Sequence, residues 1–121
     1  MSAKEFELSQ SKRLKTPAEF QAVFKQPFRS KTSQFTVLAS PNQREYPRLG
    51  LIVAKRFERK AVHRNRARRL IRESFRHNQV TLAGLDVVVL VRCGLSNQKT
   101  QILYERLEQQ WQNLAKQWQK G

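Results

Sequence analysis

The sequence has few acidic residues. It has 9 Asp and Glu against 24 Lys and Arg in 121 residues, which gives a formal net charge of +15. A compact domain this basic repels itself and is better suited to an anionic partner than to a neutral metabolite. We therefore expect a nucleic-acid-binding protein, ahead of a protein that binds anionic membranes and ahead of an ordinary metabolic enzyme.

The scarcity of cysteine and of long apolar runs excludes further classes of protein. Cys93 is the only cysteine, so an internal disulfide is impossible and a reducing compartment is favoured. The longest apolar run, Val87 to Val91, has five residues, whereas a membrane-spanning helix needs about 20. The first residues show no apolar stretch typical of a secretory signal. We expect a cytoplasmic protein with no membrane partner.

The length predicts a single domain. Residues 1–12 are polar and are predicted to form a flexible leader before a folded domain at 13–119. The first helix is predicted to start at Pro17, because Thr16 can cap it and Glu19 completes a capping box. Pro27 is predicted to end it.

Three segments are predicted to be extended: 29–40, Leu49 to Ala54, and Leu85 to Val91. The first alternates apolar and polar residues, and the other two are almost wholly apolar, which suits the middle of a sheet. A helix at about 61–77 separates the last two, so they form a βαβ unit with parallel strands. Its crossover is right-handed by default.

A last helix is predicted at about 98–118. Both later helices carry an apolar stripe at intervals of three or four residues, which predicts the core-facing side of each. The stripes are Ala67, Leu70, Ile71, Ser74 and Phe75 in the first, and Leu103, Leu107, Trp111, Leu114 and Trp118 in the second. We interpret both tryptophans as core residues.

The segment from Lys55 to Arg76 holds ten of the 24 basic residues, opposed only by Glu58 and Glu73. Like charges four residues apart destabilise a helix, so a solvated basic face is a poor explanation for this density. Arginine, which outnumbers lysine here, grips phosphate oxygens bidentately. The pattern predicts a nucleic-acid contact but does not separate RNA from DNA. A helix-turn-helix DNA binder is disfavoured, because apolar strands flank the basic helix.

A catalytic role for the protein is also disfavoured. His63 and His77 are 14 residues apart on one predicted helix, a separation of about 20 Å, so they cannot act together on one phosphate. The few carboxylates show no metal-binding spacing. We expect no catalytic side chain and no metal ligand in the protein.

Four blocks in order resemble the bacterial ribonuclease P protein subunit: Arg13 to Phe24, Arg48 to Arg56, Ala61 to Arg76 with its Arg64-Asn65-Arg66 core, and Asp86 to Val91. The resemblance implies an α+β fold: a single-domain α/β sandwich with a central, mostly antiparallel four-stranded sheet and three helices, like the second domain of ribosomal protein S5. It also implies a left-handed βαβ crossover and an extra short strand at Arg29 to Lys31.

The resemblance further implies an accessory subunit of an endoribonuclease. Its partners would be the ribonuclease P catalytic RNA and precursor tRNA, with no DNA. The RNA, using Mg²⁺, would remove the 5′ leader, and the protein alone would bind no cofactor. A basic structural RNA-binding protein of ribosomal type is the alternative, since it would share the charge but would have no leader site.

Site residues follow from the same resemblance. The residues expected to bind RNA are Lys55, Arg56, Arg64, Asn65, Arg66, Arg68, Arg69 and Arg72. The residues expected to bind the precursor leader are Lys15, Phe20, Phe24, Thr36 and Leu38, where partly exposed aromatics would stack on unpaired bases. The loop from Phe57 to Lys60 departs from the Gly-Asn pair of many members.

Overall fold

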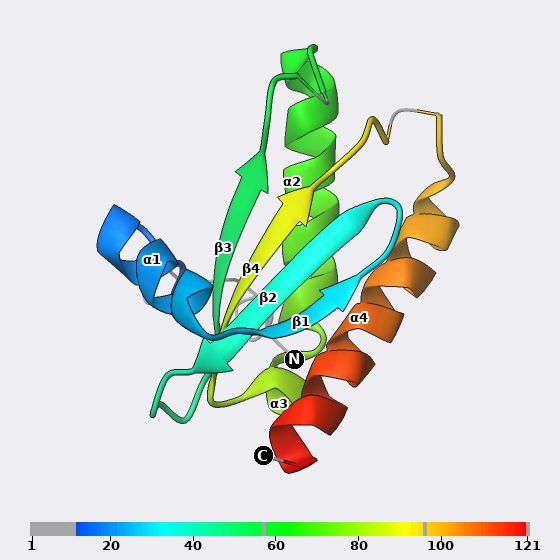
Figure 1. Ribbon diagram of the computed structural model, residues 1–121. Helices are drawn as coiled ribbons and strands as arrows, with labels where there is room; N and C mark the ends of the chain where they lie inside the picture. Colours follow the sequence, from blue (N-terminus) through cyan, green and yellow to red (C-terminus); the bar gives the residue numbers. More distant parts are fainter. Residues whose placement is uncertain (1–11, 57, 96, 121) are drawn as a thin grey trace, which may run out of the picture.

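The computed structural model describes residues 12–56, 58–95 and 97–120 (Figure 1). Its elements, in chain order, are α1 (Pro17–Lys25), β1 (Phe28–Lys31), β2 (Phe35–Pro41), β3 (Arg48–Val53), α2 (Ala61–Arg76), α3 (Gln79–Leu82), β4 (Leu85–Val91) and α4 (Thr100–Lys120). The predicted flexible leader falls almost entirely on residues 1–11, outside the described part. Within the described part, no helix is long and apolar enough to cross a membrane.

The four strands form one sheet in the order β1-β2-β4-β3. Only β3 and β4 are parallel; the other two pairs are antiparallel. The mostly antiparallel sheet is therefore confirmed. The alternating segment 29–40 is two strands, because the chain turns at Thr32, whose N–H donates to the Phe35 carbonyl at 2.8 Å. The pattern alone was wrong on this point, and the short strand implied by the resemblance is confirmed.

The sheet separates two apolar layers. The main core lies between the sheet and α2, α3 and α4; it includes both predicted stripes, with Trp111 fully buried and Trp118 partly buried against Phe28. A smaller cluster on the opposite face joins α1 to the sheet through Leu14, Val23, Leu38 and Val88. The four-residue α3 was not predicted.

The crossover between the parallel strands is left-handed. In Figure 1 the chain rises along β3, descends behind the sheet through α2 and α3, and rises again along β4 to the right of β3. The default expectation of a right-handed crossover is wrong for this chain, and the handedness implied by the resemblance is confirmed.

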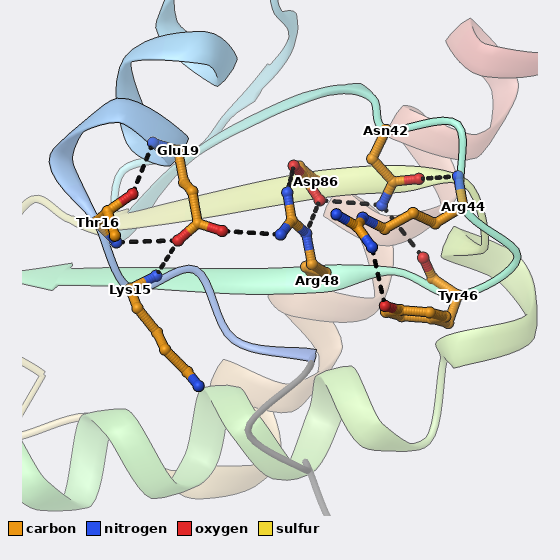
Figure 2. Close-up of polar contacts among 8 residues, drawn as sticks. All are labelled: Lys15, Thr16, Glu19, Asn42, Arg44, Tyr46, Arg48 and Asp86. Atoms are coloured by element: carbon orange, nitrogen blue, oxygen red, sulfur yellow. Dashed lines mark hydrogen bonds and ion pairs between the residues drawn. The ribbon is translucent and has the colours of Figure 1, made fainter.

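Arg48 joins α1 to the parallel strand pair (Figure 2). Its guanidinium donates to both carboxylate oxygens of Asp86 on β4, at 2.8 and 2.6 Å, and to Glu19 Oε2 on α1 at 2.8 Å. Asn42 donates to Asp86 as well, at 2.9 Å, so the β2–β3 loop shares the contact. Both Arg48 and Asp86 are largely buried, with 14% and 8% of their side chains exposed.

Glu19 completes the predicted capping box and is unusually acidic. The backbone N–H groups of Lys15 and Thr16 donate to its Oε1 at 2.7 and 2.9 Å. These two bonds, with the charge of Arg48, lower the pKa of Glu19 from 4.5 to about 2. The carboxylate is thus held ionised at the point where α1 begins.

Gly50 lets α1 approach β3 closely. A Cβ atom at this position would lie 2.5 Å from Cε1 of Phe20 and 3.2 Å from Cδ1 of Leu14. The aromatic ring therefore occupies the space where any other residue would place its side chain.

We predict that Gly50→Ala and Phe20→Ala are strongly coupled. Alanine suits a strand interior better than glycine by about 0.5–1 kcal/mol, but in the wild-type background the new methyl group must displace the Phe20 ring. We expect a coupling energy of about 1–2 kcal/mol in a double-mutant cycle measured by urea unfolding. Additive effects would contradict the close packing.

We predict that Glu19 stabilises the fold in a pH-dependent way. Because its pKa is lower in the folded state, its contribution is complete above about pH 4.5 and is lost as the pH falls towards 2. The difference in unfolding free energy between wild type and Glu19→Gln should therefore shrink over that window. Glu45→Gln, at an exposed loop carboxylate, is the matched control. A difference independent of pH would contradict the prediction.

Candidate nucleic-acid interface

The basic face of α2 borders a groove of about 540 Å³. It is lined by five arginines with one amide and one carboxylate: Arg13, Arg68, Arg69, Arg72 and Arg76, with Asn65 and Glu73. The groove therefore presents five guanidiniums and a single acidic side chain to solvent.

Like charges crowd one another inside this groove. Burial, followed by the charges of Arg13 and Arg68, lowers the pKa of Arg72. Glu73 offsets only part of this charge, because it is one carboxylate among five guanidiniums. Its Oε1 lies 3.7 Å from Arg76, and its Oε2 accepts from the Tyr104 hydroxyl at 3.1 Å. An anion in the groove would remove this repulsion.

Two groove arginines, Arg76 and Arg13, were not among the predicted site residues. Arg76 ends the basic segment that was singled out in the sequence, whereas Arg13 lies far from it in the chain. Arg13 reaches α2 because residues 13 and 14 lie along the open edge of β3: Arg13 is bridged to Leu49, and the Leu14 N–H donates to the Leu49 carbonyl at 2.9 Å. No local spacing indicates this contact, because Arg13 and α2 are about fifty residues apart in the chain.

The predicted RNA-binding residues of α2 divide into two groups. Asn65, Arg68, Arg69 and Arg72 all line the groove. Arg64 and Arg66 instead donate to backbone carbonyls, the first to Glu58 and Arg59 and the second to Leu95 and Gln98. Lys55 and Arg56 are exposed in the turn that follows β3, at the N-terminal end of α2.

The predicted leader site lies on the sheet face that carries α1. Phe20 and Phe24 are half-buried on the smaller cluster, and Lys15 is exposed just before α1. Thr36 is half-buried and its hydroxyl has no hydrogen-bond partner among the described residues, whereas Leu38 is only 8% exposed. Leu38 thus lies under α1 and offers little surface.

Strand register extends this face beyond the predicted residues. Thr36 pairs with Lys31 on one side and Leu90 on the other, and Leu90 pairs with Ile52. Paired residues point to the same face of a sheet, so the four side chains form one row across all four strands. Lys31 is exposed, and Leu90 and Ile52 are half-buried.

The two histidines lie at opposite ends of α2 and do not meet. His63 Nδ1 is 3.8 Å from Glu58 Oε2, and His77 Nδ1 is 2.8 Å from the Glu73 carbonyl. Among the described residues, no three His, Cys, Asp or Glu side chains are grouped so that they could hold a metal ion.

Comparison with known proteins identifies the family. The family model described as Ribonuclease P matches residues 8–115. A Staphylococcus aureus RNase P protein mutant with defective mRNA degradation activity is 30% identical, with a TM-score of 0.76 over 83% of this chain and 85% of that one. The Thermotoga maritima RNase P protein in complex with 1-(4-fluorophenyl)-2-thiourea is 33% identical, with a TM-score of 0.74 over 82% of this chain and 96% of that one. This chain belongs to the ribonuclease P protein family.

Proposed function

We propose that this chain is the protein subunit of ribonuclease P and that it binds both the catalytic RNA and the 5′ leader of precursor tRNA. The groove along α2, with five arginines and one carboxylate, is the observation that carries the proposal. Family membership supports tRNA processing and RNA as the partner.

The α2 groove is suited to the phosphates of a folded RNA. Its arginines are carried by a helix and by the segment bridged to the edge of β3, so the backbone positions of these side chains are set before binding. Phosphate contacts position a protein on a nucleic acid without reading its sequence. The groove therefore binds the catalytic RNA by charge and shape.

The sheet face beside α1 is suited to a single strand. Phe20, Phe24 and the row from Lys31 to Ile52 combine aromatic and aliphatic surface with a cation at the rim. Aromatic side chains stack on unpaired bases of any sequence. A 5′ leader, which differs in sequence from one precursor to another, is a ligand of this kind.

The protein contributes binding and orientation to the reaction. Groove residues hold the catalytic RNA, and the sheet face holds the leader, so the scissile bond is brought to the RNA. Hydrolysis is carried out by the RNA, with chemistry supplied by its Mg²⁺ ions. Positioning of this kind lowers the barrier by removing the entropy cost of bringing the reactants together.

We predict that leader removal at low Mg²⁺ requires both components. Cleavage of a leader-bearing precursor tRNA would be measured with bacterial ribonuclease P RNA alone, with the protein alone and with both. We expect cleavage only with both, because the bound protein adds positive charge and leader contacts that the RNA lacks.

High Mg²⁺ provides the control, since it shows that the RNA is active by itself. If the protein does not rescue active RNA at low Mg²⁺, the alternative is favoured, a basic structural RNA-binding protein of ribosomal type. Cleavage by the protein alone would place the chemistry in the protein.

We predict that Phe24→Ala weakens binding of precursor tRNA but not of mature tRNA. Stacking of one base on an aromatic side chain contributes about 1–3 kcal/mol, so precursor affinity should fall about 5-fold or more. Ile102→Ala, at an exposed apolar residue of α4, is the matched control. Equal losses for the two ligands would contradict a leader site on this face.

A further inference from the structure

Two basic loops lie side by side beyond the ends of the parallel strands. The β3–α2 loop (residues 54–60) exposes Lys55, Arg56, Arg59 and Lys60, and the β4–α4 loop (residues 92–99) exposes Arg92 and Lys99. These six positive charges repel one another, so other contacts must hold the two loops side by side.

Glu58 provides the first of these contacts. Its carboxylate is buried, with 3% of the residue exposed, and its Oε1 accepts the backbone N–H of Leu95 at 2.7 Å. Leu95 is itself 1% exposed and belongs to the main core. The β3–α2 loop is therefore anchored to the core through a residue of the other loop.

Arg66, in the second turn of α2, provides the second contact, which joins the helix to the β4–α4 loop. Its Nη1 donates to the Leu95 carbonyl at 3.1 Å, and its Nη2 donates to the Gln98 carbonyl at 3.1 Å and to Thr100 Oγ1 at 3.0 Å. A guanidinium can serve three acceptors in this way because its donors form a rigid planar fork, whereas a lysine ammonium is a point charge.

Arg69 shows the contrast one turn further along α2. It is exposed, it lines both the α2 groove and the groove between α2 and α4, and no described residue is hydrogen-bonded to it. Arg66 and Arg69 thus carry the same guanidinium group on one helix. The Arg66 guanidinium donates hydrogen bonds within the protein, whereas the Arg69 guanidinium is open to solvent.

We propose that Arg66, together with Glu58, is a positioning residue of the RNA interface and not a phosphate ligand. It holds the β4–α4 loop against the start of α2, as Glu58 holds that loop against the β3–α2 loop, so that the six loop cations present one surface to the RNA. The inference rests on the proposed function and assigns a second part of the same interface.

The first test compares charge-preserving variants in binding to ribonuclease P RNA, at a temperature where every variant is folded. Arg66→Lys should bind severalfold more weakly than wild type although its charge is kept, and Arg106→Lys, the matched control at an exposed arginine of α4 outside the interface, should bind as tightly as wild type. If Arg66→Lys binds like wild type, charge alone matters at this position and the proposal is wrong. A lower Tm with unchanged affinity would also overturn it.

The second test uses a substitution for which the change in net charge alone predicts tighter RNA binding, whereas the proposal predicts weaker binding. Removing an acidic residue makes the protein more basic and by itself strengthens RNA binding. Glu58→Ala should nevertheless weaken binding, Glu58→Gln should restore it because the amide oxygen still accepts from Leu95, and Glu45→Ala should bind at least as tightly as wild type. Tighter binding by Glu58→Ala would contradict the proposal.

The third test needs no variant and so does not depend on how the substitutions fold. Phenylglyoxal modifies accessible arginines, and mass spectrometry reports each site. In free wild type, Arg66 should react more slowly than Arg69, and RNA should protect Arg69 without further protecting Arg66. New protection of Arg66 by RNA would make it a phosphate ligand. If wild type fails to bind the RNA, the proposed function fails, while the free-protein rates still report whether Arg66 is held.

Discussion

The position of α1 depends on the guanidinium of Arg48. It is bonded to Asp86 on β4 through two donors and to Glu19 at the start of α1 through a third. Removing one partner of such a buried pair leaves an uncompensated charge and costs about 3–5 kcal/mol. Because α1 carries Phe20 and Phe24, the geometry of the proposed leader site depends on this ion pair as much as on apolar packing.

The few acidic residues explain why so much positive charge remains available. Glu19 and Asp86 are bonded to Arg48, Glu58 holds the Leu95 amide, and Glu73 is shared between Tyr104 and Arg76. Three of these carboxylates join different elements away from the α2 groove, and Glu73 alone offsets one of the groove arginines, Arg76. Acidic side chains therefore offset positive charge mainly at structural contacts, and the α2 groove keeps an excess of positive charge where an RNA would bind.

Local patterns in the sequence predicted α1, α2 and α4 but not the four-residue α3, and they did not predict the tertiary contacts. The capping box at Thr16 and the stripe from Ala67 to Phe75 follow from spacing within one helix, and both are confirmed. The Arg48 contacts join residues 29 and 38 positions apart, which no spacing rule indicates. The left-handed crossover could be predicted only from the family resemblance, since the general rule favours the other hand.

The arginines of α2 show why the number of arginines in a sequence motif does not give the number of phosphate contacts. At the start of the helix, loop carbonyls lie within reach, and the guanidiniums of Arg64 and Arg66 donate to them. Further along, Arg69 and Arg72 have no such acceptors among the described residues and face a groove that contains other arginines. The salt dependence of binding reports only charges that meet phosphates. The salt dependence of RNA binding should therefore depend on the cations of the groove and of the two loops. It should be weaker than the number of arginines in α2 suggests.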